Sequence, residues 1–423
     1  MRVLSISALA TAVAAQQMDL YSTLASDHEL STLAELLALV PEISNTLAAS
    51  SNITIFAPTN AAFDSVPRNI PEGEAIEWKN DTIAIGALLS NHVFPGYFPA
   101  EAVTDVPLFA QSLLDSSFVN YRQPVGNFTG GQYNEIVKDG DKVAVISGEF
   151  TVSYVTQADI QVENSVIIHK IDKPLSFGAP LQLFTRRDGL LNFNAAVNAA
   201  DLPYAFGNIG ADETDKQNIS DFTVFIPNDA AFEAIGSVLE GADIETLQEV
   251  LAYHLVDDVI FSTELGNVTV PSLQGNDLTV TVAEDGSAWV NGAKILFPNV
   301  LLFNGVAHII DGVLNPSDAP FDRADLKPEA AADERLAFPD ASPVSKLPFS
   351  SISYDTDSAT YSTPELLKTI IAVEAMATGS ATEATPTGAM STGEPTTVAE
   401  AGSSKLVATG AAVAAFVVAL FMV

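Results

Sequence analysis

Cysteine is absent from all 423 residues of the chain. A chain without thiols can form no disulfide framework, no thiolate metal site and no cysteine nucleophile. Basic residues are scarce: 18 Lys and Arg stand against 53 Asp and Glu, which gives a formal net charge of -35. Such a charge repels nucleic acid and anionic lipid surfaces, so we expect no nucleic acid as a partner.

The motifs of the common enzyme classes are missing as well. The sequence has no Gly-rich phosphate loop after a strand, no Gly-x-Ser-x-Gly elbow and no His-Glu-x-x-His helix. No set of acid, base and nucleophile can be assembled from what remains. We therefore predict that the protein is not an enzyme, and we expect no cofactor and no metal.

Both ends of the chain are typical of targeting segments. Arg2, a short apolar run and Val13-x-Ala15 predict a signal peptide over residues 1–15, because the run is too short to span a membrane. Near the other end, Gly402-Ser-Ser precedes an apolar stretch with no basic residue after it. This pattern predicts a GPI-attachment signal over residues 403–423, with attachment at Gly402. A retained membrane helix is the alternative.

One ten-residue segment is written almost twice. Thr54–Phe63 reads "TIFAPTNAAF" and Thr223–Phe232 reads "TVFIPNDAAF", 169 positions later. Two further pairs follow in the same order: His92 with His254, and His169 with His308, the latter two both in His-x-Ile-Asp. A shared order of motifs indicates a module that was duplicated whole.

Each copy mixes helical and extended patterns. The opening motif is a β-type run ended by a proline, and we expect Asn60 and Asp229 to cap the helix that follows. Residues 277–296 alternate around Asp285-Gly286, which predicts a β-hairpin in the later part of the copy. Helices first and strands later predict an α+β unit in each copy.

Beyond the second copy the apolar pattern weakens. Residues 317–376 are rich in Pro, Ala and acids and predict a linker, with a short helix at Pro364–Met376. Residues 377–402 lack aromatics and are dense in Thr, Ser and Gly, which predicts a disordered, O-glycosylated stalk. Five Asn-x-Ser/Thr sequons are candidate N-glycosylation sites: Asn52, Asn80, Asn127, Asn218 and Asn267.

The repeated motifs resemble those of the fasciclin domain family. The two opening segments resemble its first signature, "YHLVDDVIF" its central tyrosine-histidine segment and "NGVAHIIDGVL" its closing signature. The resemblance implies two tandem domains, at residues 16–176 and 177–316, each a twisted β-sandwich wedge with flanking helices. It also implies a role in adhesion at the cell surface or in the matrix, and GPI anchors are common in the family.

The resemblance also implies candidate partner-binding residues. In animal members, an Asp-Ile pair before the closing motif and the tyrosine-histidine segment are implicated in integrin binding. Asp159-Ile160 matches the first by residue type, and Tyr253-His254 matches the second. The first copy departs from the pattern, since Asn91 stands where the second copy has Tyr253.

The four repeated histidines have a second interpretation as buried structural residues. Each lies among apolar neighbours, so we expect the imidazoles to face inward and bond to backbone, with the closing motif supplying a partner for His254. We expect a non-enzymatic adhesion protein at the outer face of the plasma membrane or cell wall, bound to a surface protein or a matrix or wall glycan.

Two alternatives remain open at this point. One is a cell-wall polysaccharide-binding module, with Tyr97, Phe98, Tyr121 and Tyr133 as candidate aromatic platforms. The other is a vacuolar or endomembrane protein acting in trafficking, with the C-terminal helix retained.

Overall fold

The computed structural model describes residues 20–68, 71–114, 131–162, 166–206, 216–219, 221–344 and 346–349. Several predictions concern residues outside these ranges. They are the signal peptide, Asn127 and Tyr121, the helix at Pro364–Met376, the stalk, and the anchor signal with Gly402.

The first copy contains helices that precede or interrupt the start of a seven-stranded sheet. Its helices are α2 (Ser31–Leu39), α3 (Pro41–Ala49), α4 (Asn60–Asp64), α5 (Pro71–Trp78) and α6 (Thr82–Asn91). Its strands are β1 (Ile53–Pro58), β2 (Val93–Pro95), β3 (Leu108–Gln111), β4 (Tyr133–Asp139), β5 (Lys142–Ser147), β6 (Thr151–Val162) and β7 (Val166–Ile171).

The second copy follows the same plan. Its helices are α8 (Leu181–Arg187), α9 (Leu191–Ala200), α10 (Asp229–Ala234), α11 (Gly236–Gly241) and α12 (Ile244–Tyr253). Its strands are β10 (Phe222–Pro227), β11 (Leu255–Val256), β12 (Thr269–Pro271), β13 (Asp277–Val282), β14 (Ala288–Val290), β15 (Ala293–Leu301) and β16 (Gly305–Ile310), beside a small sheet of β8 (Tyr204–Ala205) and β9 (Gln217–Asn218).

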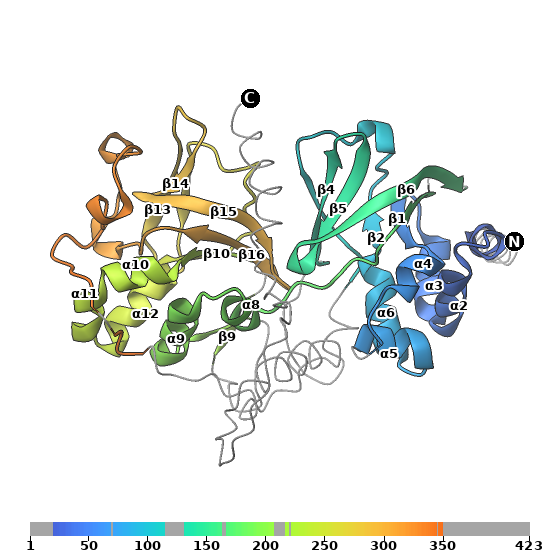
Figure 1. Ribbon diagram of the computed structural model, residues 1–423, viewed down its shortest axis with the longest axis horizontal. Coiled ribbons are helices and arrows are strands. Elements are labelled where there is room, and N and C mark those ends of the chain that lie inside the picture. The colour runs from blue at the N-terminus through green and yellow to red at the C-terminus, as the bar shows by residue number, and fades with distance from the viewer. Residues whose placement is uncertain are drawn as a thin grey trace, which may run out of the picture.

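The two seven-stranded sheets have the same topology. Their strand orders are β2-β1-β7-β6-β5-β4-β3 and β11-β10-β16-β15-β14-β13-β12. In each sheet the opening strand runs parallel to the closing strand, and the register places Phe56 opposite His169 and Phe225 opposite His308. Figure 1 shows the two copies as separate lobes, with the helices of each gathered along one side of its sheet. The predicted α+β class and duplicated fold are confirmed.

The predicted helix caps were wrong by one residue. The side chains that cap α4 and α10 belong to Thr59, which accepts from the Ala62 amide, and Asn228, which accepts from the Ala231 amide. Asn60 instead accepts from the Thr32 amide of α2 over 2.9 Å, and Asp229 accepts from the Asn192 amide of α9 over 2.9 Å. The side chain after each cap therefore satisfies the start of a helix distant in sequence, which local pattern could not show.

The predicted linker was wrong for its described part. Residues 317–344 and 346–349, here called the C-terminal strap, run along the outer side of the second copy (Figure 1). Leu347 and Phe349 are buried in the core of the second copy, and Arg335 pairs with Asp311 over 2.7 Å. A segment of low overall hydrophobicity can still bind a fold when a few apolar side chains enter its core.

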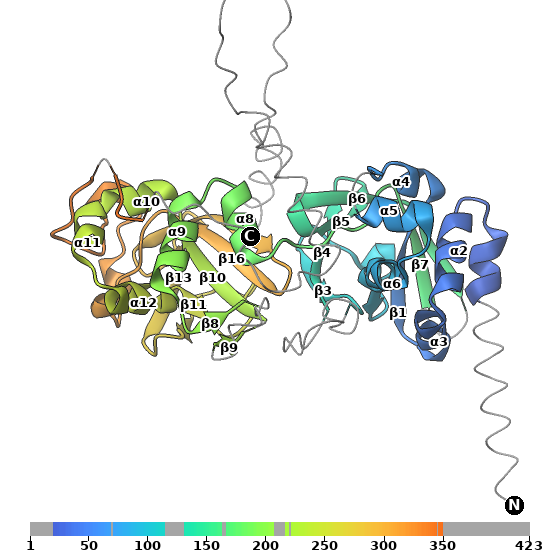
Figure 2. The same ribbon diagram turned by 90° about the horizontal axis from the view of Figure 1, so that it is seen from below.

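The two copies contact each other through aromatic side chains. Phe109 of β3 stacks on Phe261 with ring centroids 3.8 Å apart, and Tyr133 of β4 meets the same ring edge-on at 5.0 Å. The backbone amide of Phe303 also donates to the carbonyl of Ala179 over 3.1 Å. Seen from below in Figure 2, these strands and the turn into α8 lie where the two lobes meet.

Candidate functional site

His254 lies at the end of α12 and is fully buried. Its Nδ1 donates to the Val250 carbonyl over 2.7 Å, and its Nε2 accepts from the Leu314 amide over 3.0 Å. An amide can only donate, so the proton of this neutral ring is on Nδ1. Burial lowers the pKa of His254 to about 4, which keeps the ring neutral near pH 7.

His92 repeats this arrangement in the first copy. Its Nδ1 donates to the Leu88 carbonyl over 2.7 Å, and its Nε2 accepts from the Leu175 amide over 2.8 Å. Burial lowers its pKa to about 4 as well. The predicted structural role is confirmed for both residues, and the closing motif does supply the partner of His254.

The second pair of histidines has its own repeated geometry. His308 donates from Nε2 to the Ile260 carbonyl over 2.8 Å, and its Nδ1 accepts from the Asn299 amide over 3.3 Å. His169 donates to the Phe98 carbonyl over 2.9 Å and accepts from the Asp159 amide over 3.3 Å. Burial lowers the pKa of His308 to about 4 and also lowers that of His169. All four imidazoles are occupied by backbone, which leaves them no free nitrogen for catalysis or metal binding.

Tyr253 is as deeply buried as its neighbour His254. Its hydroxyl donates to the Asp277 carbonyl over 2.9 Å and accepts from Asn291 over 2.9 Å. In the first copy Asn91 takes this place and accepts from the Ser112 hydroxyl over 3.0 Å. A partner cannot reach the Tyr253 or His254 side chain in this conformation. The contact role that the resemblance implied for these two residues is therefore corrected, because their polar atoms hold the core together.

Asp159-Ile160 lies on β6 and differs from that pair in exposure. Asp159 is exposed and adopts a left-handed conformation with φ 60, as does Asn299 of the second copy with φ 59. The Asp159 carboxylate accepts from the Ala100 amide over 3.0 Å. Ile160 is half-buried against the core. Of the four candidate partner-binding residues, Asp159 is the one that a partner can contact fully.

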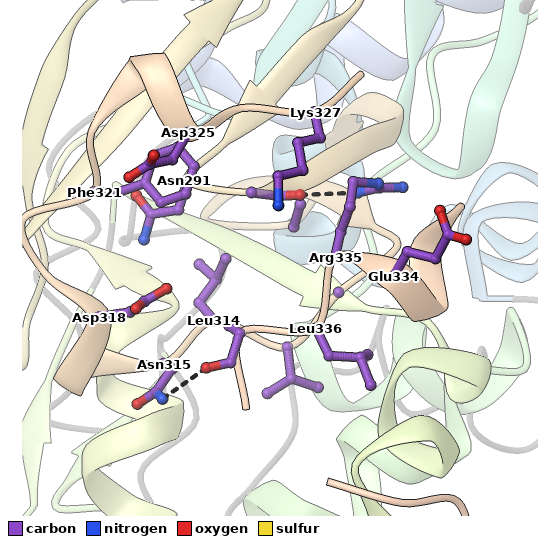
Figure 3. A pocket seen from close by; sticks show the side chains of 15 residues that line it. Asn291, Leu314, Asn315, Asp318, Phe321, Asp325, Lys327, Glu334, Arg335 and Leu336 are labelled. Carbon is purple, nitrogen blue, oxygen red and sulfur yellow. Dashed lines mark hydrogen bonds between the residues drawn. The ribbon is translucent and has the colours of Figure 1, made fainter. Parts of the chain in front are cut away.

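A pocket of about 160 Å³ lies between the second copy and the C-terminal strap. Figure 3 shows charged side chains around it, among them Asp325, Lys327 and Glu334 of the strap. Arg335 is already engaged: it bonds Asp311, and also the carbonyls of Gly292 over 2.8 Å and Ala330 over 3.0 Å. The pocket is therefore a seam where the strap is fastened, and its guanidinium is committed to structure.

No metal cluster or spanning helix occurs in the described part of the chain. No group of three or more His, Asp or Glu side chains there could hold an ion. None of the helices among those residues has both the length and the apolar character that a membrane crossing requires.

The proposed aromatic platforms are not free surfaces where the structure describes them. Tyr97 and Phe98 are half-buried, and Phe98 packs against the core of the first copy. Tyr133 is in the contact between the copies. Glu135 pairs with Phe109 across the strands and so shares its face of the sheet, and burial raises the pKa of Glu135 to about 7.

The candidate glycosylation sites differ in what surrounds them. Asn52, Asn80 and Asn267 are exposed, and Asn218 lies on β9. The Asn267 side-chain oxygen accepts from the Val282 amide over 3.1 Å. Exposed amides on turns are the usual setting for N-linked sugars, so all five sequons remain predictions.

The fold and its repeated polar contacts define a tandem α+β protein whose recurrent histidines are structural. The profile of the Fasciclin domain family matches residues 28–177 and 189–316. The chain belongs to the fasciclin domain family.

Relatives and a solved structure agree with this placement. A "Fasciclin-like arabinogalactan protein" of Arthroderma benhamiae is 30% identical over 326 residues, covering 76% of this chain and 71% of the relative. A fasciclin-like arabinogalactan protein of Phaeosphaeria nodorum is 28% identical, covering 69% of this chain and 87% of the relative. The solved FAS1 domain pair of the insect cell adhesion molecule fasciclin I aligns at 16% identity with a TM-score of 0.29, over 72% of this chain and 98% of that one.

Proposed function

We propose that this protein is a non-enzymatic adhesion protein of the cell surface, mediating cell–cell or cell–matrix contact through its two fasciclin domains. The observation that carries the proposal is the commitment of every repeated polar side chain to internal backbone contacts. What the two copies repeat is thus a scaffold, and their outer surfaces are left for binding. Two weak sites on one chain, and many chains on one surface, would give avidity without a tight single contact.

The proposal places the protein at the outer face of the plasma membrane or in the wall, held by a GPI anchor at Gly402. The supporting observations are the signal-peptide pattern, the small-residue triplet before an apolar end, and the similarity to proteins named fasciclin-like arabinogalactan proteins. Phosphatidylinositol-specific phospholipase C should release the protein from intact cells. Detection of residues 406–423 in the mature protein by mass spectrometry would contradict the anchor and favour a retained helix.

The adhesion itself is tested by expressing the full chain on cells that do not aggregate. We expect aggregation or matrix attachment to increase, and Asp159→Ala to weaken it without lowering surface level or thermal stability. Asp172→Ala, an exposed acidic change in the same copy, is a charge-matched control. Unchanged adhesion at full surface expression would contradict the proposal, and retention on purified glucan or chitin would favour the polysaccharide-binding alternative.

A further inference from the structure

The chain has two tryptophans, and they lie in opposite environments. Trp289 is fully buried beneath the Arg335 guanidinium, which lies 4.6 Å from its ring centroid. Trp78, the last residue of α5, is 67% exposed, the largest fraction among the large apolar side chains of the described residues. An indole left in water is costly, so an exposed one calls for something to cover it.

Trp78 stands two residues before a sequon, in Trp78-Lys79-Asn80-Asp81-Thr82. None of the other four sequons has an aromatic residue at that position: Ser50, Val125, Lys216 and Leu265 stand there instead. Asn80 is exposed, like Trp78. The one sequon with an aromatic neighbour thus coincides with the most exposed aromatic side chain.

The turn between Trp78 and Asn80 is held in place from both sides. Lys79 adopts a left-handed conformation with φ 54, and its side chain forms an ion pair with Glu35 of α2. Asp81 caps α6, accepting from the Ile83 amide over 3.1 Å and the Ala84 amide over 2.9 Å. Its neighbours fix the backbone while the indole and the Asn80 amide are left in solvent.

We propose that Asn80 carries an N-linked glycan whose first N-acetylglucosamine packs on the exposed face of Trp78. The C–H bonds of a pyranose face carry partial positive charge and are apolar, and the indole face is negative and apolar, so the two surfaces are complementary. The proposal rests on the secretory route that the proposed function requires. It assigns to this glycan a structural contact that the other sequons lack.

The modification uses a lipid-diphosphate-linked oligosaccharide as the co-reactant. Sugar C1 forms a bond to Nδ2 of Asn80 as the C1–O bond to the lipid diphosphate breaks. Nδ2 loses one proton, and the lipid diphosphate leaves with the electron pair of the broken bond. Nothing is oxidised or reduced.

The first measurement is glycan occupancy on the full chain from a eukaryotic secretory host. Enzymatic release of N-glycans in oxygen-18 water, followed by peptide mass spectrometry, marks each occupied asparagine. We expect Asn80 to be occupied. An unoccupied Asn80 beside an occupied Asn267 would overturn this inference while leaving secretion intact, and a chain with no glycan at all would overturn both.

The second measurement is tryptophan fluorescence, because acrylamide can reach Trp78 but not Trp289. Asn80→Gln should shift the emission to longer wavelength and raise the quenchable part of it. Asn267→Gln, which removes an exposed Asn-x-Thr sequon with no aromatic neighbour, should do neither. Trimming the glycans to a single N-acetylglucosamine should preserve the protection. Equal quenching of the occupied protein and Asn80→Gln would overturn the packing on Trp78.

Discussion

The backbone amide of Leu314 donates to Nε2 of His254 over 3.0 Å, joining the end of the closing motif to the end of α12. Leu175 and His92 make the same contact over 2.8 Å in the first copy. The segment between α12 and the closing motif holds most of the sheet, so this single bond fastens the two ends of a long excursion of the chain. Four predictions follow from this and three other contacts.

Replacing His254 with Ala should destabilise the second copy. The Leu314 amide and the Val250 carbonyl would lose their partner and a small void would open, at a combined cost of about 1–3 kcal/mol. His92→Ala should act likewise on the first copy. Denaturant unfolding measures both, and His28→Ala, at an exposed histidine, is the matched control. Full stability together with lost binding in His254→Ala would make the residue a surface contact.

The second copy should lose stability in acid. The pKa of His254 and His308 is lowered to about 4 in the fold, against 6.5 for the free side chain. Between pH 6.5 and about 4 the unfolded chain therefore binds protons that the fold excludes, so the stability present above pH 6.5 is lost as pH falls. Each histidine contributes a slope of up to about 1.4 kcal/mol per pH unit. Unfolding followed by Trp289 emission at pH 7 and pH 4.5 checks this, and equal stability at both would refute it.

The first copy should be less sensitive to acid than the second because Glu135 opposes its histidines. The pKa of Glu135 is raised to about 7 from 4.5, so its carboxyl is protonated in the fold at a pH where the unfolded chain is ionised. Stability from this group is therefore gained as pH falls from about 7 to 4.5. Glu135→Gln should remove that gain and steepen the loss of stability of the first copy in acid. An unchanged pH profile would show that Glu135 is solvated.

Arg335→Ala should release the C-terminal strap from the second copy. Asp311 would lose a buried ionic partner, and breaking such a pair costs roughly 3 kcal/mol. Limited proteolysis should then cut within residues 317–344, and the melting temperature of the second copy should drop. Lys327→Ala, at an exposed position of the same strap, controls for the loss of a positive charge. Equal proteolysis of the two variants would contradict fastening by Arg335.

Phe109 and Phe261 should be energetically coupled across the contact between the copies. Stacked rings of this kind contribute about 1 kcal/mol beyond the area that they bury. A double-mutant cycle with Phe109→Ala and Phe261→Ala measures the coupling. Ile244→Ala, at an exposed apolar residue of the second copy, should show none with Phe109→Ala. Additive effects of the Phe pair would mean that the two copies unfold independently.

The sequence by itself determined the duplication, the order of elements and the inward position of the histidines. These features are written in local periodicity and in repeated motifs: the alternation around Asp285-Gly286 predicts the β13–β14 hairpin without reference to the rest of the chain. The apolar neighbours of His254 likewise indicate burial, because a neutral imidazole satisfied by backbone is stable there.

Only the tertiary structure decided which distant groups meet. Asn60 looks locally like a helix cap, but the Thr32 amide competes for its oxygen, and Thr59 takes the cap. The composition of residues 317–349 predicts a linker, yet Leu347 and Phe349 find space in a core formed by other segments. Complementarity of this kind depends on surfaces brought together from far apart in the chain, and a linear pattern carries no record of them.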